Sequence, residues 1–91
     1  MDTILEIVKA RLGRLDTALD PYFETLISAT IEKLREEHGI HVQPTASDNV
    51  LVADYAVWRY QNRDQKDSMP EWLWQDLKDR WLAERRINRD T

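Results

Sequence analysis

Residues 48–63, DNVLVADYAVWRYQNR, are the stretch that decides the fold of this chain. When these residues are placed on an α-helix, at 100° per residue, their apolar side chains cover two sectors of the helix surface. Only narrow polar strips remain between the sectors, around Asp54 and Arg59. A helix that is apolar nearly all round is typical of one packed between other elements. The stretch therefore predicts the central helix of a small all-α domain. Its two apolar sectors consist of Val50, Val52, Ala53, Ala56, Val57 and Tyr60, and of Leu51, Tyr55 and Trp58.

The composition places the chain among small globular proteins with a thin core. It has 91 residues, of which 42% are hydrophobic, and it includes four tryptophans and three tyrosines. So much aromatic surface is hard to bury in a chain of this length, and contacts with partners could take up the excess. The absence of cysteine excludes disulfides and permits a reducing compartment. We expect no signal peptide and no membrane span, because the apolar run of the central helix is far shorter than the ~20 residues that a bilayer requires.

Charge is distributed unevenly along the chain. The net charge of −4 argues against a general binder of nucleic acids or anionic membranes. Residues 1–58 carry ten acidic and five basic side chains, whereas residues 78–91 carry three acidic and five basic ones. The front is thus acidic and the end mildly basic.

Two helices are predicted before the central one. A short helix over residues 3–12 ends at Gly13, and residues 1–13 must dock on the rest because so short a helix is marginal alone. A second helix begins with Asp20 as N-cap and Pro21 in its first turn, runs to about residue 38 and ends at Gly39. Its predicted buried stripe is Phe23, Ile27, Thr30, Ile31 and Leu34.

A loop and one further helix complete the expected fold. Residues 40–47 are predicted as an ordered loop because Pro44 interrupts their alternation, and Ser47 or Asp48 is predicted to cap the central helix. A polar loop over residues 62–68 leads to a last helix over residues 70–87, and residues 88–91 are expected to fray. The predicted core stripe of this helix is Leu73, Trp74, Leu77 and Trp81. We therefore expect one domain over residues 1–91, an antiparallel bundle of three main helices plus a short N-terminal helix.

Little in the sequence points to chemistry. His38 and His41 lie near Glu36 and Glu37, but there is no second ligand cluster, and a histidine at a helix C-terminus is explained without a metal. No serine or threonine has a histidine nearby in a plausible relay, and a chain with two glycines has no glycine-rich phosphate loop. We expect no metal, no cofactor and no enzymatic activity.

The last helix carries the candidate interaction residues. Its basic residues could contact phosphate, or could simply complement the helix macrodipole; they are Arg80, Arg85, Arg86 and Arg89. Trp72 points away from the predicted core stripe, and two interpretations stay open for it. It either folds under the loop of residues 40–47 or anchors a protein interface.

The order of these parts resembles the small head-to-tail connector (adaptor, or head-completion) proteins of long-tailed bacteriophages. The resemblance is carried by the apolar helix, Arg59-Tyr60, a short polar loop and Met69-Pro70 opening the last helix. Within those helices the matching positions are Leu51, Asp54, Tyr55, Ala56, Trp58, Leu73, Leu77 and Arg80. The short first helix, the acidic connector and LISATIEKL (residues 26–34) are similar to the opening helices of the same family.

This resemblance implies a structural subunit of the virion, made in the host cytoplasm and located at the head-to-tail interface. Such a subunit forms a dodecameric homo-oligomeric ring under the portal protein, contacts the next connector or tail protein, and lets DNA pass through the channel without specific binding. The resemblance implies no catalytic residues. It places portal and neighbour contacts loosely on Arg85, Arg86, Ile87 and Arg89, to which the residues themselves add Trp72 as an interface hypothesis.

Two other function classes compete with the connector hypothesis. A small helical DNA-binding regulator would need exposed Arg, Asn, Gln or Lys along one face of a recognition helix. The central helix is too apolar for that role, and the last helix mixes aspartates with its arginines. A generic helical adaptor for another complex is the third class.

Overall fold

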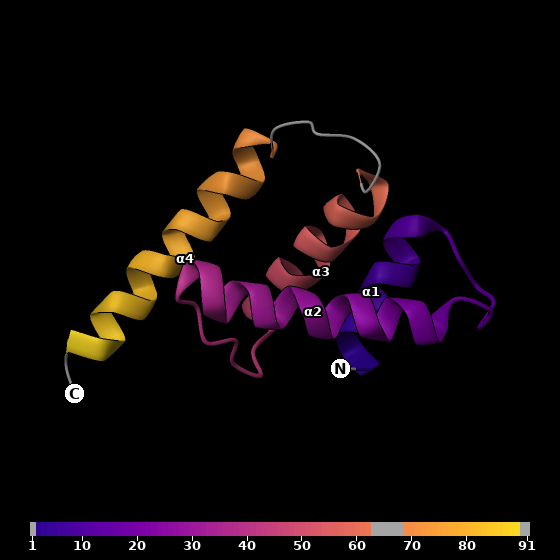
Figure 1. Ribbon diagram of the computed structural model, residues 1–91, viewed down its shortest axis with the longest axis horizontal. Helices are drawn as coiled ribbons and strands as arrows, with labels where there is room; N and C mark the ends of the chain where they lie inside the picture. The colour runs from indigo at the N-terminus through magenta and orange to yellow at the C-terminus, as the bar shows by residue number, and fades with distance from the viewer. Residues whose placement is uncertain (1, 63–68, 90–91) are drawn as a thin grey trace.

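Four helices form the described part of the chain, and the predicted all-α fold is confirmed. The computed structural model describes residues 2–62 and 69–89, with the side chains of residues 3–62 and 69–86. Figure 1 shows α4 running along the side of the molecule, next to the C-terminal end of α2. The helices are α1 (Asp2–Leu12), α2 (Asp20–His38), α3 (Ala46–Gln61) and α4 (Glu71–Arg89).

Helix α3 is the central element, as its sequence predicts. It contacts each of the other three helices, and every residue from 51 to 57 is buried. Even Asp54 is nearly inaccessible, because Arg11 of α1 pairs with its carboxylate. Trp58 packs against the edge of the core and is only partly buried. The placement of Val50 in the apolar sector was wrong: this residue is 47% exposed, because it directly precedes the buried part of α3 and lines an open depression.

Both predicted glycine stops are confirmed. Gly13 and Gly39 each have a φ of 68°, a left-handed conformation that glycine adopts without a steric penalty. After them, the amide of Arg14 donates to Lys9 O at 2.9 Å and the amide of Ile40 donates to Leu34 O at 2.9 Å. At Gly13, the bond from Arg14 and a second bond from the amide of Gly13 to Ala10 O at 3.3 Å make a Schellman motif. At Gly39, the amides of Gly39 and Ile40 both donate to Leu34 O, so a free carbonyl of the last turn is satisfied in a wider turn.

The predicted N-caps of α2 and α3 were wrong. Leu19 is the N-cap of α2, and Asp20 instead pairs with Lys9 of α1, with Nζ 3.0 Å from Oδ1. Thr45 is the N-cap of α3, where its hydroxyl accepts a hydrogen bond from the amide of Asp48 at 3.2 Å. In both cases the aspartate is drawn to a cationic partner on another helix, and such charge-assisted pairs are stronger than neutral hydrogen bonds.

The buried face of α4 differs from the predicted one. Leu73 and Leu77 are buried as expected, but Trp74 is 52% and Trp81 is 38% exposed. The stripe that faces the body of the protein continues from the leucines through Arg80 and Glu84, at the same spacing of three and four residues. The last half of α4 therefore docks through charged side chains, and its tryptophans flank the contact.

The ends of the predicted segments also changed. Residues 88–89 continue α4 instead of fraying. Residues 90–91 lie outside the described residues, as do residues 63–68 of the polar loop predicted over residues 62–68. Within the part of the chain that the structure covers, no helix is long and apolar enough to cross a membrane.

Candidate functional site

Helix α4 is fastened to the body by an almost buried arginine. Arg80 donates from Nε to Asp48 Oδ1 at 2.8 Å, and from Nη2 to Asp48 Oδ2 at 3.1 Å and to His41 O at 2.9 Å. The hydrogen bonds that Arg80 donates to Asp48 hold the pKa of Arg80 above its usual value. The sequence groups Arg80 with the basic residues at the end of α4. In the structure, Arg80 is not part of an exposed basic cluster, because its charge is paired inside the protein.

Glu84 extends this connection one turn further along α4. Its carboxylate accepts a hydrogen bond from the amide of His41 at 2.5 Å and lies 2.9 Å from His41 Nδ1. The backbone hydrogen bond in particular lowers the pKa of Glu84 below its usual 4.5. The loop between α2 and α3 is thus held by two charged residues of α4, which places α4 relative to the end of α2.

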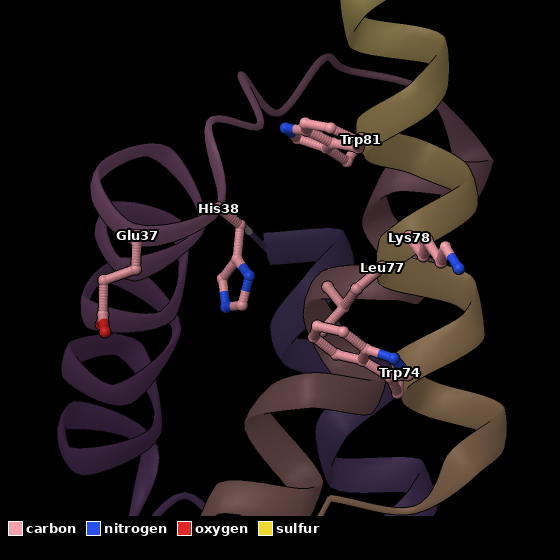
Figure 2. A pocket seen from close by; sticks show the side chains of 6 residues that line it. All are labelled: Glu37, His38, Trp74, Leu77, Lys78 and Trp81. Carbon is pink, nitrogen blue, oxygen red and sulfur yellow. The ribbon is translucent and has the colours of Figure 1, made fainter.

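A hollow of about 400 Å³ opens where α4 meets the end of α2. In Figure 2, Trp81 and Trp74 lie on either side of it, Leu77 lies at its back and the His38 ring faces it from α2. The charged ends of Glu37 and Lys78 are turned away from its centre (Figure 2). Helical periodicity places Trp74, Lys78, Trp81 and Arg85 on one face of α4, and this signal could have identified the hollow from the sequence. It was missed because Trp74 and Trp81 were predicted to lie in the core.

The side chains at the basic end of α4 are described as far as Arg86. Arg85 and Arg86 are exposed, and the guanidinium of Arg85 lies over the Trp81 ring, 5.0 Å from its centroid. This geometry is a cation–π contact. The side chains of Ile87 and Arg89, the other predicted interface residues of this segment, lie outside the described residues.

Trp72 lies on a different side of α4 from the hollow between Trp74 and Trp81. It is 49% exposed and lines a second depression, of about 430 Å³, at the C-terminal end of α3 together with Trp58, Asn62 and Pro70. The first interpretation of Trp72, that it folds under the loop of residues 40–47, was wrong. It is Trp81 that lies next to the start of this loop, since its Nε1 would be 3.7 Å from a Cβ added at Gly39.

The two histidines have separate roles. His38 Nε2 lies 3.4 Å from the Tyr55 hydroxyl, whereas His41 contacts Glu84. In the described ranges, no group of three or more His, Cys, Asp or Glu side chains is placed to hold a metal ion. The structure thus uses both rings in contacts between elements.

We expect His38 to make the stability of the protein sensitive to mild acid. Burial lowers its pKa below the usual 6.5, and the nearby Glu37 opposes this effect less than burial promotes it. In the unfolded chain the ring therefore takes up a proton at a higher pH than in the folded protein, so stability falls as the pH drops below about 6.5. Urea unfolding at pH 7.5 and pH 5.5 should show a smaller loss for His38→Gln than for the parent; equal losses would contradict the assignment.

Comparison of the chain with known protein families, with curated proteins and with solved structures finds no match.

Proposed function

We propose that this protein is a structural subunit of a bacteriophage head-to-tail connector, which assembles as a ring under the portal protein. In this role it has no catalytic task. It binds the portal above and the next connector or tail protein below, and DNA passes through the ring. The proposal comes from the resemblance in the order and packing positions of the helices, and several properties of the folded chain support it.

The order of helices agrees with what the resemblance implies. A short helix and an amphipathic one precede a buried central helix, and the last helix opens directly after Met69-Pro70. Of the matching positions, Leu51, Tyr55 and Leu73 lie in the core, and Arg80 fastens α4 to the start of α3. These positions therefore stabilise the fold of this chain.

The observation that carries the proposal is the amount of apolar surface left exposed on α4. Three tryptophans are exposed on more than one side of this helix: Trp72, Trp74 and Trp81. Tryptophan and arginine dominate the contacts that hold protein interfaces together, and here Arg85 and Arg86 follow on the same helix. Exposed apolar surface of this extent is unusual in a monomeric protein and is typical of a subunit that binds neighbours on more than one side.

The DNA-binding regulator gains no support from the arrangement of side chains. Helix α3 is enclosed by the other helices and cannot enter a groove. On α4, the side that carries Arg86 also carries Asp76 and Asp79, which would repel phosphates.

A binding experiment with portal rings tests the proposal. The portal protein of the same genome is purified as a ring, mixed with this chain, and examined by electron microscopy and sedimentation. We expect an added ring of density on one face of the portal and saturable binding. Absence of binding, together with a strong preference for one DNA sequence at ~150 mM salt, would reject the connector and favour the regulator.

Trp72→Ala should weaken portal binding without unfolding the protein. Half of the indole is already in water, so its truncation removes little core packing, and the melting temperature should fall by only a few degrees. As an interface anchor, Trp72 should contribute ~2 kcal/mol or more, which is a loss of about 30-fold in affinity. The measurements are thermal unfolding and a binding titration on the same sample.

Leu82→Ala is the matched control on the same helix, since Leu82 is also exposed but lines neither depression. It should leave portal affinity within about twofold of the parent. If Trp72→Ala instead unfolds the chain, or binds the portal as the parent does, Trp72 is not an interface anchor.

A further inference from the structure

We propose that neighbouring copies of this chain join by inserting Leu15 of one copy into the hollow between Trp74 and Trp81 of the next. This inference deepens the proposed function and rests on it for the ring, because it names the contact between ring neighbours.

Leu15 is the most exposed large apolar side chain among the described residues, with 98% of its surface accessible. Its position is defined by the backbone on both sides. The amide of Arg14 donates to Lys9 O at 2.9 Å, and the amide of Asp20 donates to Thr17 O at 3.2 Å. Arg14 and Asp16, which flank Leu15, lie 3.5 Å apart as an ion pair. The leucine therefore projects from a short, locally bonded connector, which lowers the entropy cost of placing it in a partner.

One exposed leucine is common on protein surfaces and would not support an interface alone. The second observation is the hollow at the end of α2, whose sides are the indoles of Trp74 and Trp81 and whose back is Leu77 (Figure 2). A hollow of about 400 Å³ is large enough to take a leucine side chain. A protruding aliphatic side chain and an aromatic pocket are the complementary parts of a typical interface hot spot.

The charges around the two features also match. Leu15 has a basic residue on one side and an acidic one on the other, Arg14 and Asp16. The rims of the hollow likewise carry one acid and one base, Glu37 on α2 and Lys78 on α4. Glu37 already pairs with Lys33 of its own helix. Lys78 forms no ion pair with the side chains that the structure describes, so it is the rim charge available to Asp16 of the neighbour. Attraction between Asp16 and Lys78 favours one orientation of the inserted connector.

The two features cannot meet within one molecule. The connector precedes the first residue of α2 and the hollow adjoins its last residues, and a helix of 19 residues is about 28 Å long. Figure 1 shows the connector and α4 at opposite ends of the molecule. A contact that joins one end of a subunit to the opposite end of the next is heterologous. Such contacts repeat from copy to copy, and they close into a ring when the rotation between neighbours allows it.

Mixing two defective variants tests this contact directly. Leu15→Asp destroys the inserted residue, and Trp74→Asp destroys the hollow at a position that is half in water and so spares the core. Each variant alone should associate at least tenfold more weakly than the parent. An equimolar mixture should form heterodimers that grow no further, because the Trp74→Asp copy still has Leu15 and the Leu15→Asp copy still has the hollow. Sedimentation equilibrium up to about 1 mM detects association in the millimolar range and tighter.

Controls separate this contact from misfolding and from other modes of association. Leu15→Met keeps an apolar side chain and should associate as the parent does, and Leu82→Ala should have no effect. Circular dichroism must show that both aspartate variants remain folded; if either unfolds, Leu15→Ser and Trp74→Ser replace them in the same scheme. A parent that stays monomeric at about 1 mM, or a mixture that stays monomeric, overturns the inference.

The chain contains no cysteine, so single cysteines provide an independent readout. Under mild oxidation, a mixture of Leu15→Cys and Trp74→Cys should form the mixed disulfide dimer in clear excess over the two homodimers. A statistical distribution of the three dimers overturns the contact.

Portal binding, measured in parallel, keeps the two proposals distinguishable. If the mixture fails to pair but the parent binds the portal ring, the contact is wrong and the connector function stands. If the mixture pairs but the portal is not bound, the contact is right and the connector function is wrong.

Discussion

Asp48→Ala is expected to destabilise the protein by about 3–5 kcal/mol, the usual cost of removing one partner of a buried ion pair. Asp48 accepts two hydrogen bonds from Arg80 of α4 and one from the amide of Gln43 at 2.8 Å. Without the carboxylate, the guanidinium stays in a site with little access to water and the amide loses its acceptor. For 91 residues the whole stability is about 5–14 kcal/mol, so urea unfolding should show a large loss.

A second substitution distinguishes the unpaired charge from lost packing. In Asp48→Ala/Arg80→Met the buried cation is gone as well, so part of the stability should return. Asp76→Ala removes an exposed acid of α4 and should change stability by no more than about 0.5 kcal/mol. A loss below about 1 kcal/mol for Asp48→Ala would show that α4 does not depend on this pair.

Tyr55→Ala is expected to cost about 3–5 kcal/mol, the range for truncating a large aromatic residue in a core. Tyr55 is 2% exposed in the middle of α3, and its ring packs against His38 and Trp58, with centroids 5.9 and 6.2 Å apart. Burial also raises the pKa of its hydroxyl, as expected of a phenol largely removed from water. Alanine would leave a cavity between α2 and α3, and chemical denaturation should measure the loss.

Two further variants check that the cost arises from the ring. Tyr55→Phe keeps the ring and removes only a hydroxyl whose bond to His38 is long, at 3.4 Å, so it should cost about 1 kcal/mol or less. Trp58→Ala should cost less than Tyr55→Ala because the indole is partly in water. If Trp58→Ala proved the more damaging, the core would be centred nearer the C-terminal end of α3.

The hollow on α4 shows what sequence reasoning missed about the candidate site. Trp74 and Trp81 were assigned to the core because tryptophans next to leucines in a helical stripe are usually buried. The stripe that faces the body contains Arg80 and Glu84 instead, and this becomes apparent only when their partners are known. Asp48 is 32 residues from Arg80 in the chain, and His41 is 43 residues from Glu84.

The sequence by itself determined the four helices, their glycine stops at Gly13 and Gly39, and the burial of α3. Helical periodicity and the left-handed preference of glycine act over one or two turns, so they can be read without the fold. Only the tertiary structure decided the placement of α4, the partners of Arg80, and the pairing of Trp81 with the end of α2. These features depend on side chains distant in sequence, and periodicity tells which residues share a face but not which face meets a buried opposite charge.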